Sequence, residues 1–378
     1  MSVYTVFIDA LKPSSLRHMD FLKTLSSCSI EPDLINFSNT CQASIYTGVY
    51  PNKHNHQFIW TLDPQNSPFE LLDNRVADFS IRDKYTKFLV YNLLALKNLK
   101  TVPYGFLYFA DKKPSYWANF SFEEVSHSGR PDHCLGGYPT VFELIHSAEM
   151  EYSVDWHVSD DLSDIEIQDT EEDFNYFYFG HVDPASHKHG QESDEAIEVM
   201  KQIDLILEQI YEQTSENDTF IVLSDHGHVH IENFINLADE FERNGENLND
   251  YMHFVDSCYA RFWPKSDVEK QRVTQVLESM EKGEIITTDL LRQFNSELNC
   301  DQDVILYYLS PPNVFDVVNP KTESMHGFDC RLPDSKGVFV TDDESLDAEE
   351  IQLQDFLPTV LNQMNISIPP HVDGENIL

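Results

Sequence analysis

The sequence predicts an α/β fold, a three-layer α/β/α sandwich with a mostly parallel central sheet and an inserted cap region. Continuous apolar runs of strand length lie at residues 3–8, 176–180 and 219–224, and each run is followed by a polar residue. Such strands are buried on both faces, as in a parallel sheet that helices cover. Between the last two runs, residues 194–211 place apolar side chains at helical spacing with charged side chains opposite. Strand, helix and strand together form a βαβ unit.

The length and composition of the chain allow one large domain. Of its 378 residues, 41% are hydrophobic and 12% aromatic, which is ample material for a buried core. Two stretches, at about residues 61–135 and 241–312, depart from the strand–helix pattern. The first is irregular, with basic and aromatic side chains, and the second has a strand, a helix and a strand of its own. We interpret residues 1–378 as a single domain in which both stretches are insertions that form a cap over the functional site.

The charge of the chain argues against two classes of partner. Lys and Arg number 25 against 65 Asp and Glu, a formal net charge of −40. Such a surface repels phosphate backbones and anionic lipids, so we expect neither nucleic-acid polymer binding nor membrane association. No apolar run approaches the ~20 residues that span a bilayer, and we expect the N-terminus to be a strand rather than a signal peptide. The six cysteines form no C-x-x-C pair, which predicts a cytoplasmic protein with reduced thiols.

Aspartate and histidine side chains follow two of the predicted strands. Asp183 precedes His187 by four residues just after the strand at 176–180, and the adjacent pair Asp225 and His226 follows the next strand. The carboxyl ends of parallel strands meet at one edge of a sheet, where the sites of α/β proteins form. Carboxylate oxygens and neutral imidazole nitrogens together suit zinc or manganese better than calcium. A lone histidine at a strand end is usually an ordinary polar residue, but two such segments joined by one helix predict a metal site.

Three further residues fit a site at this edge. Asp9 follows the first strand, and His326 lies shortly before a strand expected at 337–340. Ser38 lies at the start of a short helix that ends at Gly48. Two interpretations of Ser38 stay open. It is either the N-cap of the helix, or a nucleophile that faces backbone N–H groups and the helix dipole, both of which suit phosphate.

Taken in chain order, these segments resemble the alkaline phosphatase superfamily, most closely its type I phosphodiesterase/nucleotide pyrophosphatase branch. The resemblance covers nearly the whole chain and extends to a closing helix and turn at 356–361 and 372–375. It implies two divalent metal ions, for which the histidine-rich ligands favour Zn²⁺, with Mn²⁺ as the alternative. The ligands implied for one ion are Asp183, His187 and His326. The ligands implied for the other are Asp9, Asp225, His226 and the nucleophile Ser38.

The resemblance further implies a metal-dependent hydrolase of a small phosphate ester. The expected substrate is a diester or a pyrophosphate, cleaved through a phosphoseryl intermediate on Ser38 at the two-metal site. A phosphomonoesterase or a phosphonate hydrolase would use the same ions and the same nucleophile. The alternative of another class is a catalytically inactive, metal-binding scaffold. Every implied position holds a residue type that is competent for catalysis, and this favours an enzyme.

The chain departs from the branch around the nucleophile. The branch usually has Thr followed by Pro-Asn, where this chain has Ser38 followed by Asn39 and Thr40. The phosphate-binding Asn of the branch is not recognisable here, and Asn39 and Asn55 are the candidates for its role, with His56 a further one. No Pro or Arg follows Ser38 in the C/S-x-P-x-R pattern of sulfatases. Three nearby histidines have no counterpart among the ligands of the branch, and we expect them to have supporting or surface roles: His189, His228 and His230.

Overall fold

The computed structural model describes residues 2–70, 114–122, 125, 135–158, 161–167, 170, 172–298, 303–317 and 322–378. The chain divides into two compact units. The larger unit comprises Met1–Gln57, Val125–Asp316 and Pro320–Leu378, and the smaller unit comprises Phe58–Glu124 and Val317–Asn319. Most of the first predicted insertion lies outside the described residues, whereas the second lies within the larger unit.

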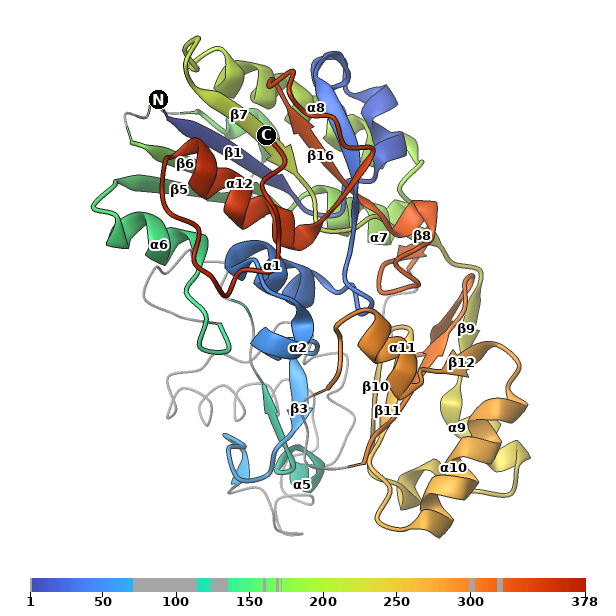
Figure 1. Ribbon diagram of the computed structural model, residues 1–378. Coiled ribbons are helices and arrows are strands. Elements are labelled where there is room, and N and C mark those ends of the chain that lie inside the picture. Colours follow the sequence, from blue (N-terminus) through green and yellow to red (C-terminus); the bar gives the residue numbers. More distant parts are fainter. Residues whose placement is uncertain are drawn as a thin grey trace. The chain divides into compact units, whose positions relative to one another are not determined.

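A seven-stranded sheet forms the centre of the larger unit, in the order β17-β2-β16-β7-β1-β6-β5 (Figure 1). Neighbouring strands are parallel, except that β16 runs antiparallel to both β2 and β7. The prediction of a mostly parallel central sheet is therefore confirmed. The strands are β1 (Val3–Ile8), β2 (Ser26–Glu31), β5 (Tyr152–His157), β6 (Phe174–Phe179), β7 (Thr219–Leu223), β16 (Gly337–Thr341) and β17 (Glu350–Gln352).

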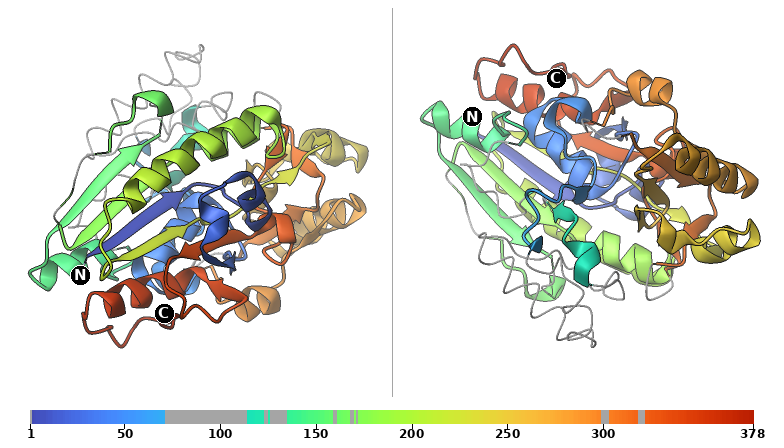
Figure 2. Two further views of the ribbon diagram at one scale, coloured as in Figure 1. Left: turned by 90° about the horizontal axis from the view of Figure 1, so that it is seen from above. Right: turned by 90° about the horizontal axis from the view of Figure 1, so that it is seen from below.

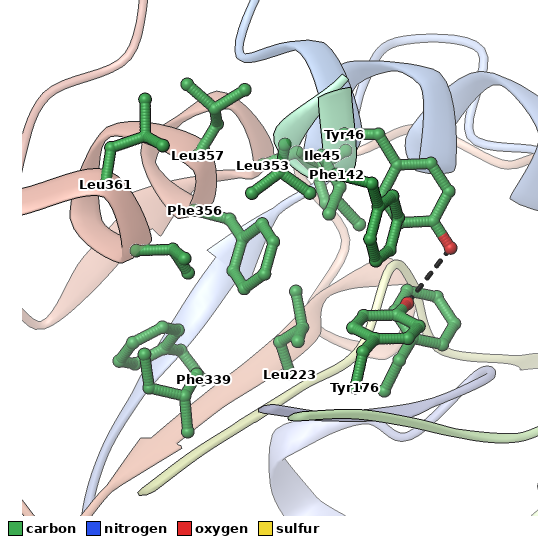
Figure 3. Packing of buried hydrophobic residues seen from close by; sticks show 14 of the residues in the cluster. Ile45, Tyr46, Phe142, Tyr176, Leu223, Phe339, Leu353, Phe356, Leu357 and Leu361 are labelled. Carbon is green, nitrogen blue, oxygen red and sulfur yellow. Dashed lines mark hydrogen bonds between the residues drawn. The ribbon is translucent and has the colours of Figure 1, made fainter. Parts of the chain in front are cut away.

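Helices cover both faces of this sheet, as the three-layer prediction requires. Alternate residues of a strand point to opposite faces, so Phe7 contributes to one buried core and Val6 to the other. The helices α1, α6 and α12 pack on the first face, where Phe142 and Phe356 lie among the core side chains (Figure 3). The long helix α8 packs on the second face (Figure 2). The bounds are α1 (Ser38–Thr47), α6 (Val141–Ser147), α8 (Asp194–Tyr211) and α12 (Phe356–Gln363).

Shorter elements complete the larger unit. A four-stranded antiparallel sheet, in the order β10-β11-β13-β12, lies within the second predicted insertion. Its strands are β10 (His253–Asp256), β11 (Tyr259–Phe262), β12 (Gly283–Ile285) and β13 (Ile305–Leu309), and the helices near it in sequence are α9 (Leu237–Arg243), α10 (Asp267–Ser279) and α11 (Thr288–Gln293). Two small sheets pair β8 (Val229–His230) with β15 (Ser324–Met325) and β9 (Asn233–Ile235) with β14 (Asn313–Phe315). The remaining α-helices are α2 (Pro51–His54) and α7 (Val182–His189). That this insertion caps the site stays a prediction.

The smaller unit contains a two-stranded antiparallel sheet and a short helix. These elements are β3 (Trp60–Leu62), β4 (Phe120–Phe122) and α5 (Pro114–Trp117). The ring of Trp60 lies 4.9 Å from that of Trp117 and 5.0 Å from that of Phe122, between centroids. All three side chains are buried, so they pack together as a small aromatic core. In the part of the chain that the structure describes, every helix is too short or too polar to traverse a bilayer.

Candidate metal centre

Polar side chains that follow strands of the central sheet gather near its carboxyl edge. Asp9 directly follows β1, and Asp225 and His226 lie just after β7. Helix α7 begins just after β6 and carries Asp183 and His187. Because β1, β6 and β7 are parallel neighbours, their carboxyl ends lie side by side and bring these side chains together.

The candidate ligands form two groups, and the ligand atoms within each group all lie within 4.8 Å of one another. The first, which we call the Asp9 group, consists of Asp9, Asp225 and His226. The second, which we call the Asp183 group, consists of Asp183, His187, His228 and His326. The structure thus brings together the six Asp and His ligands that the resemblance implies, in the two sets implied, and adds His228 to one of them.

Each carboxylate of the Asp9 group has one oxygen with hydrogen-bond donors and one without. Asp9 Oδ2 accepts a hydrogen bond from the Tyr178 hydroxyl at 2.6 Å. Asp225 Oδ1 accepts from the backbone N–H groups of Ala10 and His226, at 3.2 and 3.0 Å. The other two oxygens, Asp9 Oδ1 and Asp225 Oδ2, are buried and have no hydrogen-bond partner among the described residues. A buried carboxylate oxygen without a donor is costly unless a cation lies beside it.

The imidazole of His226 presents a lone pair to these two oxygens. Its Nδ1 lies 3.2 Å from the backbone carbonyl oxygen of Gly227, which can only accept, so Nδ1 carries the proton. Its Nε2 is therefore unprotonated in the neutral ring, and it lies 4.0 Å from Asp9 Oδ1 and 3.2 Å from Asp225 Oδ2. Three electron-pair donors thus converge, which is the arrangement that a metal ion requires.

Burial determines the charges of the Asp9 group. It raises the pKa of Asp225 to about 7. Burial, together with the negative charges of Asp225 and Asp183, raises the pKa of Asp9 well above its ordinary value. Burial also lowers the pKa of His226 to about 4, so its ring is neutral near pH 7. The group fits a divalent cation, because such an ion would offset the cost of burying both carboxylates in their charged form.

Tyr178 joins the Asp9 group to the aromatic core. Its hydroxyl is the donor to Asp9, and its ring lies stacked between those of Phe7 and Trp156. The Trp156 stack has a centroid separation of 3.6 Å and an interplanar angle of 5°. Packed rings leave the phenol few alternative positions, so its hydroxyl holds the Asp9 carboxylate in one orientation.

Ser38 is the first residue of α1, and its hydroxyl points to the Asp9 group. The N-cap of α1 is Phe37, which makes no side-chain capping hydrogen bond, so Ser38 is not the cap residue. The Oγ atom of Ser38 instead lies 3.1 Å from His226 Nε2. Since a helix N-terminus leaves backbone N–H groups without intrahelical partners, a phosphate beside Ser38 would meet hydrogen-bond donors.

The two asparagines expected to bind substrate differ in their surroundings. Asn39 is buried next to Ser38, and its Oδ1 accepts a hydrogen bond from the backbone N–H of Val125 at 2.6 Å. Its Nδ2 has no acceptor among the described residues, so it remains a donor for a ligand. Asn55 is exposed at the end of α2, where its Nδ2 donates to the carbonyl of Lys53 at 3.2 Å. A substrate role for either residue stays a prediction, and the buried Nδ2 favours Asn39.

The Asp183 group is centred on one carboxylate oxygen. Asp183 Oδ1 lies 3.3 Å from His187 Nε2, 2.9 Å from His228 Nε2 and 3.7 Å from His326 Nε2. The Nδ1 of His187 lies 3.0 Å from the carbonyl oxygen of Ser324, so its Nε2 also presents a lone pair. The rings of His326 and His226 stack at a centroid distance of 4.2 Å, which places the two groups next to each other.

Sequence reasoning missed His228. His226, His228 and His230 follow β7 at a spacing of two, so the sequence pattern alone does not separate them. In the structure, His228 is buried in the Asp183 group, whereas His230 is exposed. His189 faces Glu195, with 3.8 Å between its Nδ1 and Oε1, and it lies in neither group. The residue that distinguishes His228 is Ser324, whose hydroxyl lies 2.9 Å from its Nδ1.

The chain is similar to a known protein family and to solved structures. The family model of the type I phosphodiesterase / nucleotide pyrophosphatase matches residues 3–329. No curated protein matches the chain. Human ectonucleotide pyrophosphatase/phosphodiesterase 5 has a similar structure, with a TM-score of 0.70 and 13% identity over 99% of this chain and 97% of that chain.

Two murine structures are similar as well. Murine ectonucleotide pyrophosphatase/phosphodiesterase 5 matches with a TM-score of 0.67 and 12% identity, over 98% of this chain and 97% of that chain. An inactive variant of the murine protein in complex with AMP matches with a TM-score of 0.66 and 13% identity, over 98% of this chain and 96% of that chain. At such low identity, these similarities establish a shared fold.

Proposed function

Because the chain belongs to the type I phosphodiesterase / nucleotide pyrophosphatase family, we propose that it hydrolyses a small phosphate diester or pyrophosphate with Ser38 as the nucleophile. Family membership makes it an enzyme that hydrolyses phosphate esters. One observation carries the assignment of the nucleophile. The Ser38 hydroxyl lies 3.1 Å from His226 Nε2, beside a group whose two buried carboxylate oxygens lack donors among the described residues.

The two groups fit two divalent ions. The Asp9 group with Ser38 would hold one ion, and Asp183, His187 and His326 would hold the other. Four histidine nitrogens among the candidate ligands favour Zn²⁺, with Mn²⁺ as the alternative. When bound, the ions would lower the pKa of the Ser38 hydroxyl and offset the charge of a phosphate in a chain of net charge −40.

The residues of the chain would bring about hydrolysis in two displacements. Ser38 Oγ gives up its proton and attacks phosphorus, an Oγ–P bond forms, and the P–O bond to the leaving group breaks as the leaving oxygen takes up that proton. Water then attacks the phosphoserine, its oxygen remains on phosphorus, and Ser38 regains a proton as the Oγ–P bond breaks. The Asn39 side-chain amide, together with those N–H groups at the start of α1 that have no intrahelical acceptor, would supply hydrogen bonds to the phosphate oxygens in both steps.

The proposal is tested by the hydrolysis of bis-p-nitrophenyl phosphate and of p-nitrophenyl phosphate, with protein loaded with Zn²⁺ or Mn²⁺. We expect the diester to be the better substrate. Ser38→Ala should lose activity on it by at least about 1,000-fold, while Ser38→Thr, which keeps a hydroxyl nucleophile, should retain measurable turnover.

Other outcomes would change the proposal in defined ways. A preference for the monoester would move the function to a phosphomonoesterase that uses the same site. Turnover by Ser38→Ala near the wild-type rate, with both ions bound, would exclude Ser38 as the nucleophile. Bound ions without turnover of diesters, monoesters, pyrophosphates or phosphonates would favour the inactive metal-binding scaffold.

A further inference from the structure

His228 has a hydrogen-bond environment that determines which of its nitrogens carries the proton. Its ring is buried, and its Nδ1 lies 2.9 Å from Ser324 Oγ. The Ser324 hydroxyl lies 2.6 Å from the backbone carbonyl oxygen of Ser186, to which it donates its single proton. Ser324 Oγ can therefore only accept from His228, so the proton of the neutral ring is on Nδ1.

The other nitrogen of His228 then faces an atom that also has no proton. Its Nε2 lies 2.9 Å from Asp183 Oδ1, a carboxylate oxygen. The Nε2 atoms of His187 and His326 lie 3.3 and 3.7 Å from the same oxygen. A proton on one ring would satisfy one of these three pairs and leave the others, whereas a cation among the four atoms satisfies all of them.

The spacing of these atoms fits one tetrahedral ion. Ligand bonds of about 2.0–2.1 Å place neighbouring ligand atoms of a tetrahedron roughly 3.3 Å apart. The three distances from Asp183 Oδ1, between 2.9 and 3.7 Å, lie on both sides of that value. The Asp183 group therefore offers four protein ligands where the family resemblance implies three.

We propose that His228 is a fourth side-chain ligand of the ion held by Asp183, His187 and His326, and that it closes this site. The inference rests on the proposed function, because it concerns one of the two ions of the same centre. Zinc sites with four protein ligands are typical of tightly held structural ions, whereas catalytic sites keep an open position. In the Asp9 group the fourth ligand would be Ser38, the proposed nucleophile, so that group remains the place where the substrate reacts.

Ion content tests this assignment independently of turnover. The zinc-loaded protein is dialysed against a chelator of intermediate affinity, and the ions retained per chain are counted. We expect His228→Gln to lose affinity at one site by on the order of 100-fold or more and to retain one ion fewer than the wild type. The matched control is His230→Ala, which removes an exposed imidazole two residues along the same segment and should retain ions as the wild type does.

A measurement on the wild-type chain keeps the test decisive if the variant does not fold. X-ray absorption at the zinc edge, with one equivalent of Zn²⁺, counts the imidazoles around the more tightly held ion. Three imidazoles with one carboxylate support the closed site. Two imidazoles, one imidazole, or unchanged ion retention in folded His228→Gln would overturn it. A wild-type protein that retains both ions but hydrolyses no phosphate ester would contradict the proposed function and leave the ligand assignment standing.

Discussion

Two buried regions of this molecule combine aspartate, histidine and serine side chains, one a separate cluster and the other the candidate metal centre with its Asp9 and Asp183 groups, and they differ in how their protons are distributed. In the first, which we call the Asp33 cluster, Asp33 accepts from Ser44 at 2.6 Å and from Gln354 at 2.9 Å. His54 Nδ1 accepts from the backbone N–H of His56 at 3.0 Å, so its Nε2 carries the proton and donates to Ser44 Oγ, also at 3.0 Å. Each of these bonds has one donor and one acceptor.

The Asp9 and Asp183 groups have the opposite character, because lone pairs face one another. Asp9 Oδ1 and Asp225 Oδ2 have no hydrogen-bond partner among the described residues, and His228 Nε2 faces Asp183 Oδ1 without a proton of its own. The same residue types therefore serve two purposes. Where donors and acceptors match, the cluster joins parts of the fold. Where acceptors outnumber donors, as in these two groups of the described residues, a cation would complete the cluster.

The sharpest test of this contrast compares two serines of α1. Ser38→Ala should lower kcat for a phosphodiester by at least about 1,000-fold and leave the free energy of unfolding nearly unchanged. Ser44→Ala should do the reverse, because it leaves Asp33 Oδ2 without its donor and His54 Nε2 without an acceptor, at about 1–3 kcal/mol for each buried group. Kinetics and urea denaturation of both variants provide the measurement. A large loss of kcat in folded Ser44→Ala would assign the Asp33 cluster to the chemistry and break the comparison.

A smaller effect, on ion affinity, is expected from substitution of one of the two tyrosines of β6. Tyr178→Phe removes the donor to Asp9 Oδ2 and should weaken ion binding at the Asp9 group by about 10- to 100-fold. Tyr176→Phe is the matched control, since its hydroxyl pairs with that of Tyr46 at 2.9 Å (Figure 3) and Tyr176 belongs to neither group. Titration with zinc in competition with a chelator should separate the two variants. Equal affinities would show that the Tyr178 hydroxyl does not orient Asp9.

The smallest expected effect is a dependence of ion binding on pH. Burial raises the pKa of Asp225 to about 7, and a proton and an ion compete for its carboxylate. Ion affinity at the Asp9 group should therefore fall as the pH drops through about 7, by up to about tenfold per pH unit for the proton on Asp225, and protonation of Asp9, whose pKa is also raised, acts in the same direction. The pKa of His226, lowered to about 4 by burial, places its own protonation below this range. Calorimetry from pH 5 to 8, in steps of about one unit, measures the ion affinity at each pH and so gives the slope of log affinity against pH.

The control for the pH experiment comes from the Asp33 cluster. Burial raises the pKa of Asp33 to about 7 as well, but no ion site surrounds it among the described residues. Asp33→Asn should leave the slope of ion affinity unchanged. It should alter only stability, because a carboxyl group with a raised pKa in the folded state contributes stability at low pH that is lost as the pH rises through about 7. A slope that disappears in Asp33→Asn would contradict the assignment to Asp225.

The strongest local patterns in the sequence predicted the centre of the fold. β1 and α8 have the predicted bounds, because continuous apolar runs and helical periodicity are clear there. The strand β2 could not be predicted, since in Ser26–Glu31 only Cys28 and Ile30 are buried. The position of β16 between β2 and β7 could not be predicted from the sequence either, because strand order depends on packing between distant segments.

The residues of the candidate site likewise include some that the sequence could identify and some that it could not. Its carboxylates and most of its histidines could be named because they follow strands that end at one edge. His228 could not, because what separates it from His230 is a contact with Ser324, 96 residues further along the chain. The orientation of the Asn39 amide likewise depends on a distant residue, because the backbone N–H of Val125 donates to Asn39 Oδ1 and leaves Nδ2 to bond to a ligand.

The ring stack on Tyr178 gives the molecule an intrinsic optical reporter. The indole of Trp156 lies against the Tyr178 ring, and the Tyr178 hydroxyl bonds directly to Asp9. The indole is therefore separated from Asp9 by one ring and one hydrogen bond. Of the other three tryptophans, Trp60 and Trp117 lie in the smaller unit and Trp263 in the larger one. With these three replaced by Phe, we expect the fluorescence of Trp156 to change when an ion binds to the Asp9 group.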